Sequence, residues 1–165
     1  MNKNQFKRQS LGVAPTGGEA ILYTDSEEAL VIQDLEKRTD FEAMRLKRLL
    51  ALPDLTCKIG SPVKFVLDKI LTLPILETFD VLKIPETISV ENNFDLFDFP
   101  AEHPARRETD TYFLSANRIL RTHTTSMWLY YLTDPENLKK LKERGWVGLL
   151  AYGKVYRKEI GRAHV

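Results

Sequence analysis

Apolar residues recur at helical spacing through residues 26–52, and this periodicity predicts helices over that stretch. Ser61 followed by Pro62 has the pattern of an N-cap and a first helical residue, which predicts a helix to about Leu71. Asp134 followed by Pro135 has the same pattern and predicts a second such helix, which Gly145 ends. The chain is therefore expected to be helical in several separate stretches.

Short apolar runs bounded by turn residues predict the strands. Phe79–Ile84 is such a run, and Thr111–Leu114 with Ile119–Arg121 form a predicted hairpin. Val147–Tyr156 is apolar and contains two glycines, which favours a buried strand, and a short helix is expected at residues 127–132. This mixture of elements predicts an α/β protein.

Two stretches lack a regular pattern. Residues 1–19 combine glycines and a proline with polar residues, and we expect an irregular lead-in. Residues 92–104 hold several aromatic and aliphatic residues next to Pro100 and Pro104, which favours a loop packed on the core. Neither stretch is repeated elsewhere in the chain.

Composition bounds the class of protein. The 165 residues are 43% apolar and 28% charged, as in an ordinary one-domain globular protein. The net charge of +1 excludes a highly cationic nucleic-acid coat protein. Cys57 has no second cysteine to pair with, no Cys/His cluster has metal-ligand spacing, and no apolar run is long enough to span a membrane. We therefore expect a cytoplasmic protein without a metal site.

Three segments carry candidate chemistry. Residues 120–126 bring a cation, an imidazole and several hydroxyls to a predicted strand-to-helix junction, where they either bind a small polar ligand or cap the helix. Arg157 follows an apolar alternation and either clamps a phosphate or carboxylate or lies on the surface. In residues 101–106, His103 and Arg106 are interpreted as scaffold residues.

The order and context of these segments resemble the catalytic domain of phenylalanyl-tRNA synthetases, which have the class II synthetase fold. The resemblance covers residues 61–158, whereas residues 1–60, a lead-in and helical region, resemble no tRNA-binding coiled coil. The segments that carry the resemblance are Phe79–Pro85, Asn93–Pro100, His103–Arg106, Asp110–Leu114, Ile119–Ser126 and Gly153–Lys158.

This resemblance implies a fold and an activity. The fold would be an α/β class II core, with an antiparallel sheet flanked by helices and incomplete at the C-terminus. The activity would be ATP-dependent activation of phenylalanine and its transfer to tRNA(Phe), with ATP and Mg²⁺ as cofactors. A synthetase β subunit or a second copy of the chain would bind through the first class II motif near Pro85, and no membrane would be involved.

Roles follow residue by residue from the same resemblance. Arg157 matches the motif 2 arginine that contacts the α-phosphate of ATP, and Glu159 stands at the position of its acidic partner. His123, Thr125, Ser126 and Trp128 match positions around the bound amino acid, although bacterial members usually have glutamine where Trp128 stands.

After Arg157 the chain departs from the family pattern. Residues 160–165 read as the translation of a common sequencing adapter, so we expect the native sequence to end at Lys158 and residues 159–165 to be a non-native tail. A chain cut within motif 2 is expected to be inactive alone. A phosphoserine-type class II ligase, or a non-catalytic paralogue that binds tRNA or a partner, remains an alternative because the discriminating positions would lie downstream.

Overall fold

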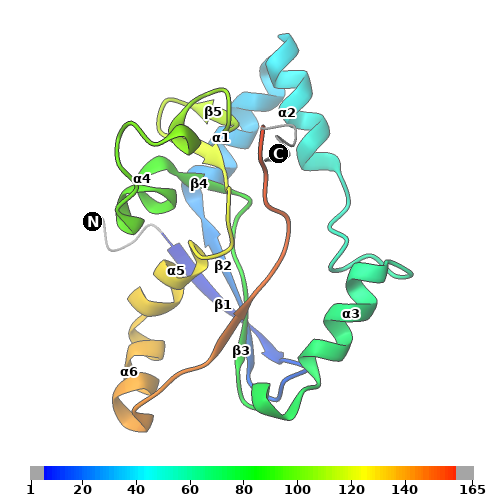
Figure 1. Cartoon of the computed structure of the whole chain (residues 1–165), viewed down its shortest axis with the longest axis vertical. Coiled ribbons are helices and arrows are strands. Elements are labelled where there is room, and N and C mark those ends of the chain that lie inside the picture. The colour runs from blue at the N-terminus through cyan, green and yellow to red at the C-terminus, as the bar shows by residue number, and fades with distance from the viewer. Residues whose placement is uncertain (1–5, 159–165) are drawn as a thin grey trace, which may run out of the picture. The chain divides into compact units, whose positions relative to one another are not determined.

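The computed structural model describes residues 6–158 and divides into two compact units (Figure 1). The predicted tail, with Glu159, lies outside the described residues. Each unit is assembled from segments that are distant in the sequence. The first contains residues 6–26, 53–85 and 127–154, and the second contains residues 27–52, 86–126 and 155–158.

A four-stranded mixed sheet forms the centre of the first unit. Its strands lie in the order β1-β2-β3-β7, with β1 antiparallel to β2 and the other two pairs parallel. The expected sheet was antiparallel, so the two parallel pairs are a departure within the α/β class. The strands are β1 (Phe6–Val13), β2 (Glu19–Asp25), β3 (Asp80–Lys83) and β7 (Leu149–Ala151).

The helices of this unit begin where the sequence predicts. Ser61 Oγ accepts a hydrogen bond from the Val63 N–H at 3.2 Å, and Asp134 caps the last helix through the Glu136 N–H at 2.9 Å. Gly145 ends that helix in the left-handed conformation, with φ 76°. The helices are α3 (Pro62–Leu71), the 3₁₀ turn η1 (Pro74–Leu76), α5 (Met127–Thr133) and α6 (Pro135–Arg144).

The irregular lead-in expected for residues 1–19 is wrong over the described part of that stretch. Residues 6–25 form the β1–β2 hairpin, in which Gly17 adopts φ 83° in the turn. At Gly18 a Cβ atom would lie 2.2 Å from the carbonyl oxygen of Phe79. The glycines therefore serve a tight turn and a close backbone approach, which are compatible with regular strands on either side.

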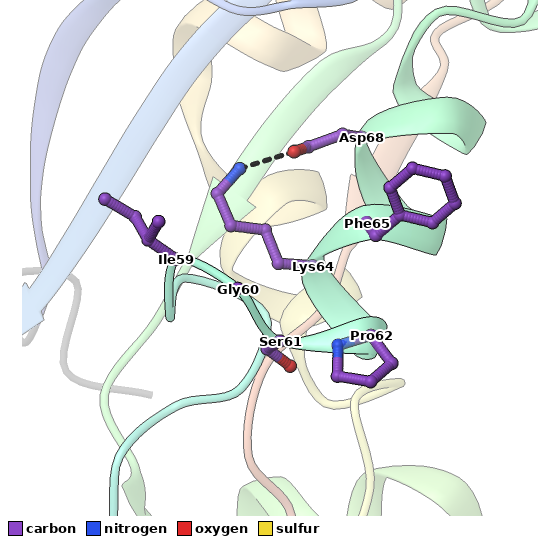
Figure 2. A pocket seen from close by; sticks show the side chains of 7 residues that line it. All are labelled: Ile59, Gly60, Ser61, Pro62, Lys64, Phe65 and Asp68. Carbon is purple, nitrogen blue, oxygen red and sulfur yellow. Dashed lines mark hydrogen bonds and ion pairs between the residues drawn. The ribbon is translucent and has the colours of Figure 1, made fainter.

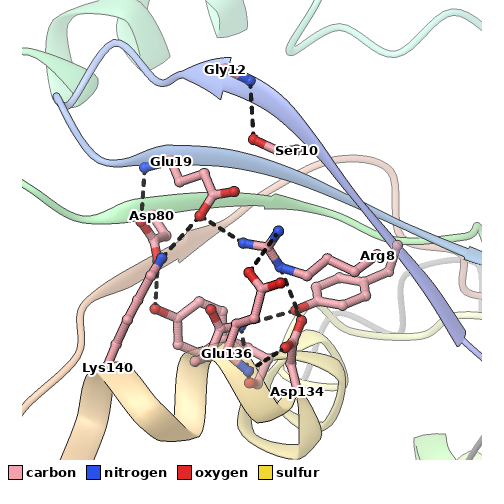
Figure 3. Close-up of polar contacts among 11 residues, drawn as sticks. Arg8, Ser10, Gly12, Glu19, Asp80, Asp134, Glu136 and Lys140 are labelled. Carbon is pink, nitrogen blue, oxygen red and sulfur yellow. Dashed lines mark hydrogen bonds and ion pairs between the residues drawn. The ribbon is translucent and has the colours of Figure 1, made fainter. Parts of the chain in front are cut away.

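Ion pairs bind this hairpin to α6 (Figure 3). The Arg8 guanidinium lies 2.6 Å from Glu19 and 3.1 Å from the buried Asp134. Lys140 lies 3.0 Å from Glu19 and 2.9 Å from the buried Asp80. Partial burial favours the neutral acid of Glu19, but hydrogen bonds from Arg8 and Lys140 outweigh it and lower its pKa to about 2. Glu19 therefore joins both cations as a carboxylate.

The second unit combines three α-helices with a three-stranded antiparallel sheet in the order β4-β6-β5. Its core packs α1 and α2 against residues of the hairpin predicted from the sequence, including Leu114 and Leu120. The elements are α1 (Ser26–Lys37), α2 (Phe41–Ala51), β4 (Thr87–Ser89), α4 (Val90–Asn93), the 3₁₀ turns η2 (Asp95–Phe97) and η3 (Pro104–Arg106), β5 (Phe113–Ser115) and β6 (Arg118–Leu120).

The strand expected over Val147–Tyr156 is much shorter than predicted. Only Leu149–Ala151 pairs with β3, and Gly153 has φ 138°, outside the β conformation of residues with side chains. Residues 155–158 belong to the second unit instead, where their backbone bonds to Arg121 and Asp110. Within residues 6–158 no helix is long and apolar enough to cross a membrane.

Candidate functional site

The side chain of Arg157 is exposed and makes no hydrogen bond or ion pair within the described part of the chain. Its backbone is nevertheless held on both sides. The Tyr156 N–H donates to the Arg121 carbonyl at 2.9 Å, and the Lys158 N–H donates to the Asp110 carbonyl at 2.9 Å. The ring of Tyr156 is buried, so the alternation along this segment directs the neighbouring guanidinium outward. The backbone of Arg157 is therefore fixed, and among residues 6–158 its guanidinium has no partner that would compete with an anionic ligand.

The other cation of this segment is already neutralised. Lys158 Nζ lies 3.0 Å from a Glu42 carboxylate oxygen and 5.6 Å from the centre of the Tyr112 ring. Arg45 lies over the same ring at 5.0 Å and donates to its hydroxyl at 3.0 Å. Arg157 is therefore the cation of this segment that can receive an anionic ligand.

His123 is fixed at the start of the second candidate segment. Its Nε2 donates to the Asn93 carbonyl at 2.9 Å, because a carbonyl oxygen can only accept. Phe97 meets the imidazole edge to face at 5.3 Å between ring centres, and Phe99 lies parallel to it at 6.2 Å. Nδ1 is buried and has no partner among the residues the structure describes. The orientation of the His123 ring is thus set by one hydrogen bond and two aromatic contacts.

The hydroxyls beside this imidazole differ in exposure. Ser126 is fully buried, and its Oγ donates to the His123 carbonyl at 3.1 Å. Thr122 is buried and bonded to the Asn93 side chain, whereas Thr125 is exposed. The Ser126 hydroxyl therefore stabilises the turn that precedes α5. Thr125 keeps an exposed hydroxyl for a ligand.

The remaining predicted residues lie elsewhere. Trp128 is on α5 in the first unit and is 41% exposed, and Glu159 is outside the described residues. His103 Nδ1 accepts from the Ala105 N–H at 3.1 Å and caps η3, while Arg106 donates to the Phe99 carbonyl at 2.7 Å. The interpretation of His103 and Arg106 as scaffold residues is confirmed.

The two candidate segments of the second unit are linked through the backbone. The Tyr156–Arg121 hydrogen bond joins the Arg157 segment to the residues that lead to His123. The guanidinium fits a phosphate oxygen. Residues 6–158 contain no cluster of three or more acidic, histidine or cysteine side chains arranged to hold a metal ion.

Comparison with known proteins identifies the family. Residues 54–165 match the model of the tRNA synthetases class II core domain (F). The chain belongs to this family. The segments of both units from residue 54 onward are therefore parts of a class II synthetase core, and the resemblance found in the sequence is confirmed.

Similar curated relatives carry one name, phenylalanine–tRNA ligase alpha subunit. The protein from Thermotoga neapolitana is 32% identical over 143 residues, which are 85% of this chain and 41% of the relative. That from Persephonella marina is 34% identical over 133 residues, or 79% and 36% of the two chains. That from Ruthia magnifica is 30% identical over 146 residues, or 87% and 40%. The chain thus spans about two fifths of the length of these relatives.

Sequence reasoning did not assign a role to Asn93. It is completely buried at the end of α4, where it contacts both Thr122 and His123. The available signal was an asparagine directly before a phenylalanine-rich run, because a buried amide must find partners for both its oxygen and its nitrogen. The partners themselves lie 29 and 30 residues further along the chain.

Proposed function

We propose that this chain is part of a phenylalanine–tRNA ligase that activates phenylalanine with ATP and transfers it to tRNA(Phe) in the cytoplasm. The observation that carries the proposal is the class II core domain match over residues 54–165. The names of the curated relatives support phenylalanine as the amino acid.

Arg157 is assigned to the α-phosphate of ATP. In the activation step a carboxylate oxygen of phenylalanine attacks this phosphorus, a new P–O bond forms, and pyrophosphate leaves with the electrons of the broken P–O bond. Negative charge accumulates on the phosphoryl oxygens as this occurs, and the Arg157 guanidinium, which has no partner among residues 6–158 and stands on a fixed backbone, would stabilise it. Magnesium would neutralise further phosphate charge. By the resemblance, an acidic partner of Arg157 is proposed at position 159, where this chain has Glu159 of the expected non-native tail.

The amino acid is assigned to the segment that follows β6. His123 and Thr125 would hold the charged ends of phenylalanine, and the contacts that support this are the fixed imidazole and the exposed Thr125 hydroxyl. Ser126, which is fully buried and donates to the His123 carbonyl, would contribute by shaping this segment. Positioning and charge neutralisation suffice for this reaction, so no protein nucleophile is required.

A partner surface is proposed on α3. Its side chains Val63, Val66 and Ile70 recur at helical spacing on one face and are 45%, 55% and 40% exposed, and Phe65, which precedes Val66, is 65% exposed. A hollow of about 530 Å³ opens beside the start of this helix, and Lys64 and Asp68, which line it, pair at 2.6 Å along α3 (Figure 2). We assign this surface, which leads through β3 to Pro85, to a synthetase β subunit, because the relatives are named alpha subunits.

Aminoacylation tests the proposed function. The full-length protein that carries this chain, assembled with its partner subunit, is incubated with ATP, labelled phenylalanine and tRNA(Phe). The proposal expects charging of tRNA(Phe) that requires ATP. Charging with phosphoserine instead would establish the sister ligase, and tRNA binding without charging would establish a non-catalytic paralogue.

A further inference from the structure

Both ends of the buried Asn93 side chain contact Thr122. The Thr122 N–H donates to Asn93 Oδ1 at 3.2 Å, and Asn93 Nδ2 donates to Thr122 Oγ1 at 2.8 Å. The backbone N–H can only donate, so its partner must be the amide oxygen, and this fixes the orientation of the amide. The Asn93 side chain thereby holds Thr122 at two points, the backbone N–H and the side-chain hydroxyl.

The backbone of Asn93 contacts the next residue of that segment. Its carbonyl accepts from His123 Nε2 at 2.9 Å, which requires a proton on Nε2. Phe97 and Phe99, which pack on the imidazole, belong to the same chain segment as Asn93. The residues around α4 and η2 thus set the position of Thr122 and the orientation of His123 together.

We propose that Asn93 is a positioning residue for the amino-acid substrate: it holds Thr122 and His123 so that the segment ending at Ser126 has its binding conformation before the substrate arrives. This inference rests on the proposed function, which assigns that segment to the amino acid. Asn93 itself is completely buried and acts through its neighbours. Preorganisation of this kind reduces the ordering cost of binding.

The hydrogen bonds of the Asn93 side chain do not extend to the segment that carries Arg157. Arg157 is held by backbone hydrogen bonds that Tyr156 and Lys158 make to Arg121 and Asp110, none of which involves the Asn93 side chain. Loss of the Asn93 contacts should therefore weaken phenylalanine binding and leave ATP binding almost unchanged. General destabilisation would affect both substrates.

The kinetic test uses the full-length protein with its partner subunit, in phenylalanine-dependent ATP–pyrophosphate exchange. Asn93→Ala and Thr122→Val are each expected to raise the KM for phenylalanine about ten-fold, the scale of one buried hydrogen bond, with the KM for ATP within about two-fold of the wild type. Thr122→Ser, the matched control, keeps the hydroxyl and should behave almost like the wild type. An equal rise in both KM values, or no rise in either, would overturn the proposal. If Asn93→Ala does not fold, the proposal is tested by the two Thr122 variants: it requires a raised KM for phenylalanine in Thr122→Val and a nearly unchanged one in Thr122→Ser.

Hydrogen exchange followed by mass spectrometry gives a readout that does not depend on activity. In the same assembly, Asn93→Ala should accelerate amide exchange about ten-fold or more in the peptide containing Thr122, because its N–H loses its acceptor, and not in a peptide from α2. Unchanged exchange at Thr122 would contradict the role of Asn93. If Asn93→Ala shows the expected faster exchange but the wild-type protein has no phenylalanine-dependent activity, the structural role of Asn93 holds and only the proposed function is contradicted.

Discussion

The Tyr156 N–H donates a hydrogen bond to the Arg121 carbonyl at 2.9 Å. This contact joins residues 155–158, which carry Arg157, to the segment that continues into His123. The two segments are separated by more than 30 residues in the sequence and belong to the same unit. The proposed contacts with ATP and with the amino acid therefore share one hydrogen-bonded framework.

Arg157→Ala should lower kcat for ATP–pyrophosphate exchange about 100- to 1,000-fold, the usual effect of removing a group that stabilises developing charge. Its exposed side chain makes no contact within the described residues, so the melting temperature should be unchanged. Arg107→Ala, which removes another exposed arginine of the same unit, is the control and should retain full activity. Activity equal to the wild type in Arg157→Ala would exclude the assigned role.

Arg8→Ala should destabilise the first unit by about 3 kcal/mol, because it leaves the buried Asp134 carboxylate without its cation. Urea unfolding measures this difference. Lys139→Ala is the matched control, since Lys139 and Glu143 form an exposed pair at 3.7 Å that should contribute less than about 1 kcal/mol. Equal effects of the two substitutions would show that the Arg8 cluster contributes no more than a surface pair.

The ion pairs of Glu19 should make part of the stability depend on pH. Its pKa in the folded protein is about 2, below the ordinary value of 4.5, so its contribution is fully present above about pH 4.5 and is lost as the pH falls towards 2. The difference in free energy of unfolding between the wild type and Glu19→Gln should shrink over this interval. Urea unfolding at pH 5.5, 4 and 3 measures it, and a difference that is constant with pH would contradict the shift.

Gly18→Ala should destabilise the protein by about 1–3 kcal/mol, because the new methyl group would meet the Phe79 backbone. Gly60→Ala serves as the comparison: Gly60 has φ 80° but open space around its Cβ position, so only backbone strain opposes the change. Thermal unfolding should rank Gly18→Ala as the more damaging substitution. The opposite order would contradict the close approach at Gly18.

The proposed β-subunit surface on α3 can be tested separately. Val66→Asp should abolish co-purification of the partner subunit, because it places a charge in the centre of the exposed apolar face. Leu30→Asp changes an apolar residue that is 61% exposed on α1 and should leave assembly intact. Loss of assembly in both variants, or in neither, would count against α3 as the interface.

Local signals predicted much of the fold. Ser61 and Asp134 are N-caps as expected, because a cap followed by proline is determined by a few neighbouring residues. The β1–β2 hairpin was missed because Gly17 and Gly18 indicate a turn but not whether strands flank it. Its stability depends on Arg8 and its partners, which are distant in the sequence.

The candidate site could be predicted only in part. Arg157 and His123 were identified through a family resemblance, since spacing alone favoured a surface arginine at 157 and a helix cap in residues 124–126. Asn93 was not assigned a role because its partners follow from tertiary packing. A buried amide in an aromatic-rich segment does indicate that partners exist.

Amino-acid-dependent ATP–pyrophosphate exchange tests the central claim most directly. The full-length protein, with its partner subunit, is assayed with each amino acid in turn, phosphoserine included. Exchange that depends on phenylalanine and is lost in Arg157→Ala is the predicted result. Exchange with another amino acid, or none with any of them, would contradict assignment of this chain to a phenylalanine–tRNA ligase.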